Sequence, residues 1–162
     1  MRVVNIIFIV IAVNLINSQS FNLNNNWPHD STLYLVGSPV GLGINSNDEL
    51  VIFHRGDRQW TFPFPSEKIK SNTIAIIDNE SGKILKSFGA NMFIMPHGLE
   101  VDYDDNIWVT DVALHQIFKF SSEGELIFTL GNEAKAGNDN YSFNLPALSL
   151  IHISEPTRRI TI

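Results

Sequence analysis

Short apolar runs bounded by Gly, Asn, Asp or Ser recur along the chain from about residue 32. Such runs, with turn residues about every eight to twelve positions, predict β-strands. No window has an apolar repeat of helical period, so the pattern predicts an all-β protein. The predicted strands are Leu33–Val36, Leu50–Phe53, Ile74–Ile77, Ile84–Leu85, Ile107–Val109, Ile117–Phe120 and Leu126–Thr129.

One structural unit is repeated along the chain. Residues 41–54 align without a gap on residues 98–111, matching a Gly-Leu pair, an Asp/Asn turn and an apolar strand. Residues 81–89 likewise match residues 123–131, and the spacing falls from about 57 to about 42 because the first copy has a longer connection over residues 59–71. A unit of about 42 residues with four short strands predicts a propeller blade. Two blades do not close a ring, so we expect further blades in the native protein.

The amino-terminal residues predict secretion. Arg2 precedes the apolar run Val3–Leu15, and small residues follow at Ser18 and Ser20, which predicts a cleavable signal peptide over residues 1–20. A membrane span is the weaker interpretation, because interrupting Asn residues leave the run shorter than the roughly 20 residues that a bilayer requires.

The rest of the chain divides by composition. Residues 21–31 are Asn-rich and predict an extended polar arm, and residues 32–146 form the partial propeller. Residues 147–162 lack both the Gly-Leu pair and the Asp/Asn turn, and they resemble a translated sequencing adapter. We therefore expect a non-native tail, with a genuine variable terminus as the alternative.

Composition narrows the function classes. A net charge of −6 with few, scattered Lys and Arg residues argues against nucleic-acid binding. The absence of Cys and of a Gly-x-Ser-x-Gly elbow argues against a nucleophilic hydrolase. Asn79 and Asn140 begin Asn-x-Ser motifs and are candidate glycosylation sites, as expected for a glycoprotein that is secreted or held in the secretory-vesicle lumen.

Three segments carry the candidate chemistry: Val-Ile-Phe-His-Arg-Gly-Asp-Arg at 51–58, Met-Pro-His-Gly-Leu at 95–99 and Trp-Val-Thr-Asp-Val-Ala-Leu-His-Gln at 108–116. With these segments, the chain resembles the peptidyl-α-hydroxyglycine α-amidating lyases from about Trp27 to Pro146. The resemblance implies an NHL-type β-propeller of six blades, of which this chain holds roughly two. It also implies a peptidylamidoglycolate lyase, which cleaves peptidyl-α-hydroxyglycine into an amidated peptide and glyoxylate during peptide hormone maturation.

The resemblance implies roles for individual residues. His97 corresponds to one of three histidines that bind a catalytic zinc, and Arg55 to an active-site arginine that binds substrate oxygen. The backbone carbonyls of Leu42 and Leu99 correspond to ligands of a structural calcium. Three imidazoles leave zinc an open position, and calcium prefers oxygen ligands. The other two histidines and the tyrosine base lie outside this chain, so we expect the chain alone to be inactive.

The residues by themselves leave alternatives open. His97 could be a turn or channel residue, and Arg55 could form a surface ion pair with Asp57. Asp111 stands where the repeat places a turn, so it is expected to form structural hydrogen bonds, as is His115. The candidates for supporting the site are His54, Asp57, Arg58, Asp111 and His115.

Two function classes remain. The leading interpretation is a secreted, stand-alone lyase that acts on C-terminally α-hydroxyglycine-extended peptides, with no copper-monooxygenase half between the signal peptide and the propeller. The alternative is a secreted, non-catalytic NHL-type propeller that binds partners. Such a protein would keep the Gly-Leu pairs and Asp turns, but it would not need the motifs at 51–58 and 95–99 together.

Overall fold

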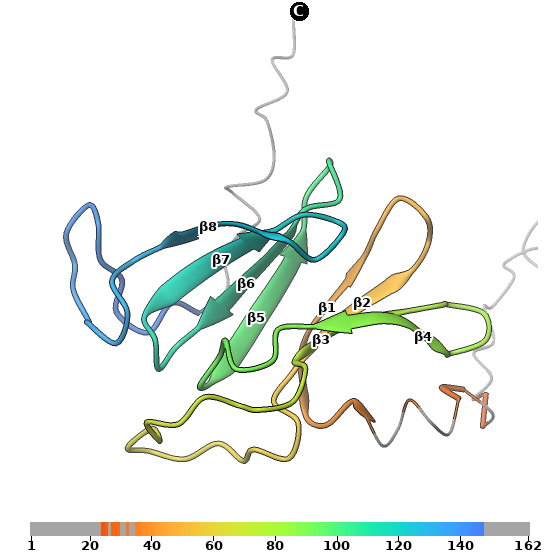
Figure 1. Cartoon of the computed structure of the whole chain (residues 1–162), viewed down its shortest axis with the longest axis horizontal. Coiled ribbons are helices and arrows are strands. Elements are labelled where there is room, and N and C mark those ends of the chain that lie inside the picture. The colour runs from red at the N-terminus through yellow and green to blue at the C-terminus, as the bar shows by residue number, and fades with distance from the viewer. Residues whose placement is uncertain (1–23, 26, 30–31, 33–34, 148–162) are drawn as a thin grey trace, which may run out of the picture.

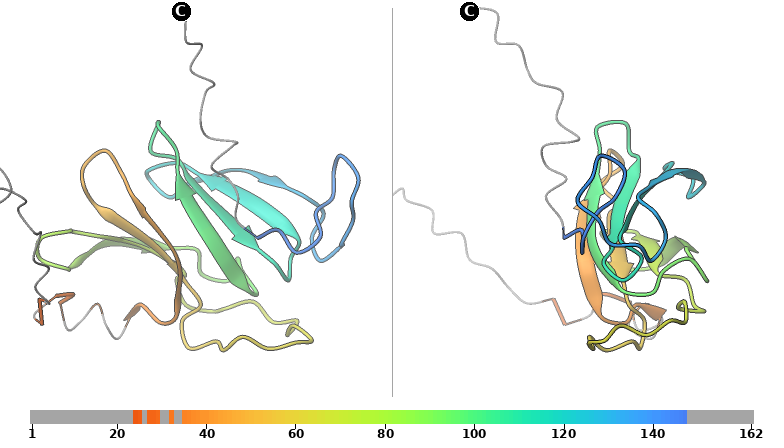
Figure 2. Two further views of the ribbon diagram at one scale, coloured as in Figure 1. Left: turned by 180° about the vertical axis from the view of Figure 1, so that it is seen from behind. Right: turned by 90° about the vertical axis from the view of Figure 1, so that its left-hand side faces the viewer.

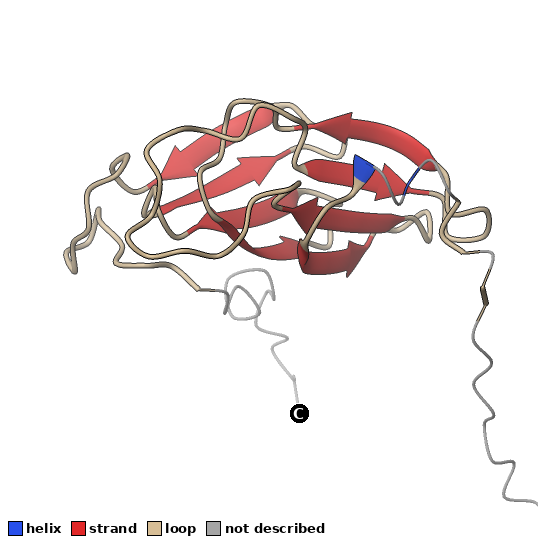
Figure 3. Cartoon of the chain, turned by 90° about the horizontal axis from the view of Figure 1, so that it is seen from below, coloured by secondary structure: helices blue, strands red, loops and turns tan. Residues whose placement is uncertain are grey.

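The computed structural model of the protein describes residues 24–25, 27–29, 32 and 35–147. In this part of the chain, two four-stranded antiparallel sheets stand side by side, and within each sheet every strand pairs with the next one along the chain (Figure 1). Strands and the loops between them make up nearly all of the described chain (Figure 3). The predicted all-β fold, with two blade-like sheets, is confirmed. The strands are β1 (Pro39–Ile44), β2 (Leu50–His54), β3 (Ile74–Ile77), β4 (Ile84–Phe88), β5 (Pro96–Val101), β6 (Ile107–Asp111), β7 (Gln116–Phe120) and β8 (Leu126–Leu130).

The first strand of each sheet differs from the sequence prediction. The strand predicted at Leu33–Val36 is wrong where the structure describes it, because Leu35 and Val36 precede β1 and lie in no strand. The pattern missed β1 and β5, whose Pro and Gly residues are typical of turns. Proline is tolerated at the first position of an edge strand. The predicted signal peptide, and the predicted tail from residue 148 onward, lie outside the described residues.

β1 and β5 lie next to each other where the two sheets meet (Figure 1). A Cβ atom on Gly41 in β1 would lie 2.5 Å from the backbone nitrogen of Leu99 in β5. Glycine is therefore needed here for close packing of the two strands rather than for a turn. This contact places the two Gly-Leu pairs of the sequence repeat side by side.

The main hydrophobic core lies between the two sheets. Phe93, in the link between β4 and β5, is fully buried, and its ring centroid lies 4.9 Å from that of Phe53 and 4.9 Å from that of Phe118. One residue of the link thus packs against strands of both sheets, which fixes the path of the chain into β5. The other buried members of this core are Val51, Ile74, Ile76, Ile94, Leu99, Ile107, Val109, Leu114 and Phe120.

The amino-terminal arm is packed where the structure describes it. The indole Nε1 of Trp27 donates to the backbone carbonyl of Asn79 at 2.9 Å, and the Thr32 hydroxyl donates to the carbonyl of Gly82 at 2.6 Å. The extended polar arm predicted for residues 21–31 stays a prediction, because the structure describes only residues 24–25 and 27–29 of it. These hydrogen bonds join Trp27 and Thr32 to the β3–β4 turn.

Both outer sides of the two-sheet unit expose apolar side chains. Leu42 and Ile44 of β1 are more than half exposed, and β8 exposes a row of large apolar residues. Contiguous exposed apolar surface of this kind marks contact sites, as blades have with their neighbours in a propeller. The closed ring of six blades stays a prediction. The exposed residues of β8 are Leu126, Ile127, Phe128 and Leu130.

Asp102 fixes the β5–β6 hairpin at the end opposite to the Pro-His-Gly-Leu motif. Its carboxylate accepts hydrogen bonds from the indole of Trp108 at 2.9 Å and from the backbone and side chain of Asn106, and it forms an ion pair with Lys119 at 3.2 Å. Burial alone would raise the pKa of Asp102, but these hydrogen bonds outweigh it and lower the pKa to about 2. The charged carboxylate therefore stabilises the hairpin.

This lowered pKa predicts acid sensitivity. Because the folded pKa lies below the unfolded value, the stabilisation is fully present above about pH 4 to 5 and is lost as the pH falls towards 2. The loss should amount to about 2 kcal/mol. Urea unfolding of the wild type and of Asp102→Asn at pH 6 and pH 2.5 measures it. The difference in unfolding free energy between the two proteins should shrink at the lower pH, and an equal difference at both pH values would contradict the assignment.

Candidate functional site

His97 occupies a β-bulge at the start of β5. Pro96 pairs with Asp111 and Gly98 pairs with Thr110 across the β5–β6 ladder, so His97 is the extra residue between the two pairs. The first sheet has the same bulge at Val40, between Pro39 and Gly41. The bulge is therefore a feature of the blade, and the second sheet places an imidazole at this position. Bulges of this kind often direct a side chain at an active site.

The imidazole of His97 has a free nitrogen. Its Nδ1 is buried and has no hydrogen-bond partner within the described part of the chain. Burial, and then the nearby positive charge of Arg55, lower the pKa of His97, so the ring is neutral at pH 7. A histidine with a purely structural role usually has its ring nitrogens paired when they are buried. A neutral imidazole with an unpartnered nitrogen suits a metal ligand instead.

Arg55 comes from the other sheet and lies beside His97. It is the first residue after β2, and its Nε donates to the carbonyl of Pro96 at 2.9 Å. Burial lowers the pKa of Arg55, whereas the charge of Asp111 raises it, and the guanidinium remains charged at neutral pH. The alternative ion pair with Asp57 is not among the ion pairs of the described residues. The guanidinium instead joins the end of the first sheet to the start of the second.

Trp60 contacts both Arg55 and His97. No sequence motif predicted this role for Trp60. The guanidinium carbon of Arg55 lies 5.0 Å from the Trp60 ring centroid, and the His97 ring lies 6.0 Å from it in an edge-on arrangement. Trp60 belongs to the β2–β3 connection, which runs from the first sheet to the end of the second in all views (Figure 2). The available signal was the extra length of this connection relative to the second repeat.

Asp111 holds the chain on both sides of β5 and β6 from a buried position. Its side chain is fully buried at the end of β6, and its two carboxylate oxygens accept four backbone N–H bonds of 2.7 to 3.0 Å. Burial raises the pKa of Asp111, and the backbone hydrogen bonds act in the opposite direction. The expected structural role is what the structure shows. The four donors are Ile94 and Met95, which precede β5, and Ala113 and Leu114, which follow β6.

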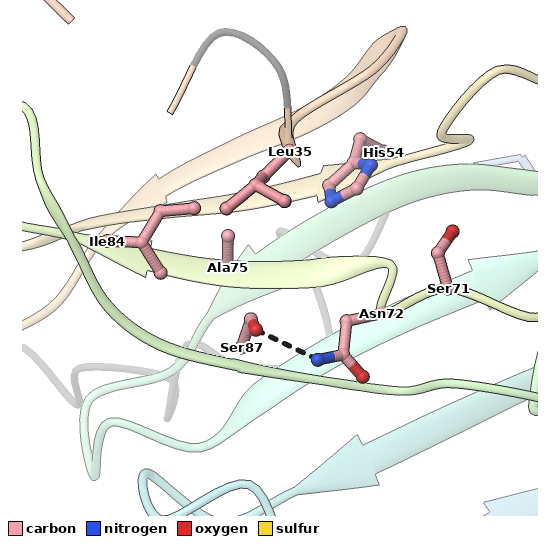
Figure 4. Close-up of a pocket in the computed structure, with 7 residues that line it drawn as sticks. All are labelled: Leu35, His54, Ser71, Asn72, Ala75, Ile84 and Ser87. Atoms are coloured by element: carbon pink, nitrogen blue, oxygen red, sulfur yellow. Dashed lines mark hydrogen bonds between the residues drawn. The ribbon is translucent and has the colours of Figure 1, made fainter. Parts of the chain in front are cut away.

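His54 has a structural role in the first sheet. Its Nδ1 accepts the backbone N–H groups of Gly56 at 3.1 Å and Gly37 at 3.4 Å, and burial lowers its pKa. The ring borders a cavity of about 120 Å³ together with Asn72 and Ser87, which are hydrogen-bonded to each other (Figure 4). Ligand pockets usually enclose about 300–1,000 Å³, so this cavity suits water rather than a peptide.

The remaining candidates support loops. One Nη of Arg58 donates to the carbonyls of Glu67 and Ile94, both at 2.7 Å, which ties the β2–β3 connection to the link before β5. His115 has a positive φ of 56°, and its Nδ1 accepts the backbone N–H of Leu145 at 3.0 Å. Asp57 is exposed and lies in no ion pair of the described residues.

The two expected calcium positions lie in edge strands, and the two glycosylation candidates are exposed. Leu42 and Leu99 occupy equivalent places in the adjoining strands β1 and β5, each of which has a sheet partner on one side. Edge strands leave alternate carbonyl groups free of the ladder, and such oxygens suit calcium. Asn79 and Asn140 are both exposed.

No three His, Asp or Glu side chains of the described part of the chain converge into a group that could hold a metal ion. No helix within the same residues is long and apolar enough to cross a membrane.

Several known proteins with similar sequences are named as amidating lyases. The chain is 37% identical to a probable peptidyl-alpha-hydroxyglycine alpha-amidating lyase of Caenorhabditis elegans, over 68% of this chain and 34% of that protein. It is 33% identical to peptidyl-alpha-hydroxyglycine alpha-amidating lyase 2 of Drosophila melanogaster, over 82% of this chain and 32% of that protein. Over this stretch the chain is homologous to the peptidyl-α-hydroxyglycine α-amidating lyases. The family resemblance that the motifs indicated is thereby confirmed.

The chain is also similar to a longer relative in sequence and, weakly, to one solved structure. The chain is also 42% identical to the peptidyl-glycine alpha-amidating monooxygenase B of Xenopus laevis, over 68% of this chain and 14% of that protein. The chain therefore spans about one seventh of that relative and about one third of the two lyases. No family model matches the chain. A solved streptogramin B lyase shares 18% identity and a TM-score of 0.42, over 59% of this chain and 27% of that one, and this weak likeness carries no argument.

Proposed function

We propose that this chain forms part of a peptidylamidoglycolate lyase, which converts a peptidyl-α-hydroxyglycine into an amidated peptide and glyoxylate. The homology to proteins named as lyases of this kind supports the proposal. The non-catalytic alternative has no comparable support. We further propose that the enzyme acts in the secretory pathway, with zinc as its catalytic metal and calcium as a structural ion.

The meeting of Arg55 and His97 is the observation that carries this proposal. The two residues come from different sheets and are 42 positions apart, yet Arg55 is hydrogen-bonded to Pro96, the residue next to His97. A permanent cation beside a neutral, unpartnered imidazole can bind an anionic substrate and hold a metal at neighbouring positions. The C-terminal carboxylate of a peptidyl-α-hydroxyglycine supplies the matching negative charge.

The proposed reaction breaks the bond between the amide nitrogen and the α-carbon of the hydroxyglycine. The α-hydroxyl loses its proton, its oxygen becomes the aldehyde oxygen of glyoxylate, and the amide nitrogen gains a proton as it leaves. Arg55 would bind and orient the carboxylate through its planar guanidinium. Bound at His97 and two histidines elsewhere in the protein, zinc would supply Lewis acidity.

Replacing Arg55 tests this assignment in the protein that the complete transcript encodes. Arg55→Ala should lower kcat/KM for a peptidyl-α-hydroxyglycine by about 10- to 100-fold, because it removes a charge-assisted contact with the carboxylate. Arg55→Lys should recover only part of this loss, because an ammonium does not match a carboxylate with two parallel bonds. Glyoxylate release measures the activity.

Lys70→Ala is the matched control, since Lys70 is an exposed cation of the same β2–β3 connection. This variant should keep wild-type activity. A wild-type protein that releases no glyoxylate, or an Arg55→Ala variant with unchanged kcat/KM, would contradict the proposed function.

A further inference from the structure

The β2–β3 connection carries three aromatic side chains beside the candidate site, of which Trp60 and Phe62 are exposed and Phe64 is partly buried. Trp60, Phe62 and Phe64 alternate in the sequence Trp-Thr-Phe-Pro-Phe-Pro. Trp60 is 52% exposed and Phe62 is 79% exposed. The ring centroid of Phe64 lies 5.4 Å from that of Trp60 and 5.5 Å from that of Phe62, with both pairs edge-on. These three rings, here called the aromatic strip, form one continuous surface.

The connection that carries the aromatic strip is held in place at its far end. Ile69 is buried, its backbone N–H donates to the carbonyl of Phe93 at 2.7 Å, and its carbonyl accepts the N–H of Asn91 at 2.8 Å. Prolines at positions 63 and 65 fix the backbone φ next to the two Phe residues. A surface that is ordered before binding loses little conformational entropy when a ligand binds, which favours a binding role.

The aromatic strip ends at the residues proposed to bind the substrate. Trp60 contacts both the guanidinium of Arg55 and the ring of His97. Each step from ring to ring is longer than the roughly 3.5 Å that one residue spans in an extended peptide. A peptide whose terminal carboxylate lies at Arg55 could therefore place its preceding one or two side chains along the strip.

We propose that the aromatic strip binds the side chain that precedes the α-hydroxyglycine, and that it favours substrates with an aromatic or large apolar residue there. This inference rests on the proposed lyase function. Large exposed aromatic surface is costly to keep in water, and edge-on aromatic contacts add to the apolar contact that a bound side chain makes. Arg55 defines the polar end of the same surface, so the occupant is a peptide with a C-terminal carboxylate.

Two substrates that differ in one side chain test the proposal in the protein from the complete transcript. Acetyl-Phe-α-hydroxyglycine and acetyl-Ala-α-hydroxyglycine are compared by kcat/KM for glyoxylate release. The wild type should prefer the Phe substrate by about tenfold. The double variant Phe62→Ser/Phe64→Ser should reduce this preference to about twofold or less, mainly through a higher KM for the Phe substrate. Trp60 is left intact because it contacts Arg55 and His97.

Tyr103→Ser is the matched control, because Tyr103 is 93% exposed on the β5–β6 turn, at the opposite end of β5 from His97. It should keep the wild-type preference. Retained activity on the Ala substrate shows that the double variant is folded, and the single variant Phe62→Ser takes its place if it is not. An unchanged preference with active enzyme overturns this inference alone, whereas no glyoxylate release from either substrate by the wild type overturns the proposed function as well.

Discussion

Replacing His97 with alanine is expected to remove both bound zinc and glyoxylate release from the protein that the complete transcript encodes. The imidazole Nδ1 is buried without a hydrogen-bond partner among the described residues, which leaves this nitrogen available to a metal ion. Loss of groups that only support metal ligands commonly costs 10- to 100-fold, and loss of a ligand itself should exceed about 100-fold. Metal analysis of the purified protein and a glyoxylate assay measure the two effects.

His115→Ala provides the matched control for this substitution. Its ring accepts a backbone N–H from Leu145 and lies at a turn after β6. The variant should keep its zinc, and it should lose no more than about 1 kcal/mol of stability with the hydrogen bond. Zinc retained by His97→Ala at the wild-type level would refute the ligand assignment, even if the activity changed.

Replacing Asp111 with alanine is expected to destabilise the protein by about 4 kcal/mol. The substitution leaves three buried backbone N–H groups and one part-buried N–H group without an acceptor, and each unsatisfied buried group costs roughly 1–3 kcal/mol before the structure relaxes. The loss approaches the total stability of many domains. Asp111→Asn should be less harmful, because an amide oxygen accepts some of these bonds, although its NH₂ group opposes the others. Urea unfolding followed by circular dichroism measures both variants.

A surface aspartate shows whether this loss is specific to the buried carboxylate. Asp57→Ala removes one negative charge, as Asp111→Ala does, but from an exposed carboxylate. It should change the unfolding free energy by less than about 0.5 kcal/mol. Hydrogen exchange adds a local measurement, since the amides of Ile94 and Met95 should lose protection in Asp111→Ala. A loss below about 1 kcal/mol would show that Asp111 does not hold this region together.

The second to fourth strands of each sheet were predictable from the sequence, whereas the first strands were not. Apolar runs such as Leu50–Phe53 and Ile117–Phe120 are buried and pair on both sides, so their composition reports their structure directly. β1 and β5 contain Pro and Gly for a reason that lies outside their own sequence. Gly41 is required because Leu99 of the neighbouring sheet packs against it.

The motifs identified Arg55 and His97, but they did not show how the two residues meet. The open alternative for Arg55 was an ion pair with Asp57, which is a neighbour in sequence. In the structure Arg55 bonds instead to the carbonyl of Pro96 and packs on Trp60. Trp60 carries no motif of its own, so only the placement of the β2–β3 connection shows that it joins the site.

The sequence by itself determined the all-β class, the repeated four-stranded unit and the homology to amidating lyases, because local apolar pattern and motif are properties of neighbouring residues. The tertiary structure decided which residues come together. The contacts of Arg55 with Pro96 and of Trp60 with His97 join residues of the two blades, which pack along β1 and β5. That packing results from contacts between residues far apart in the chain, and no local pattern records them.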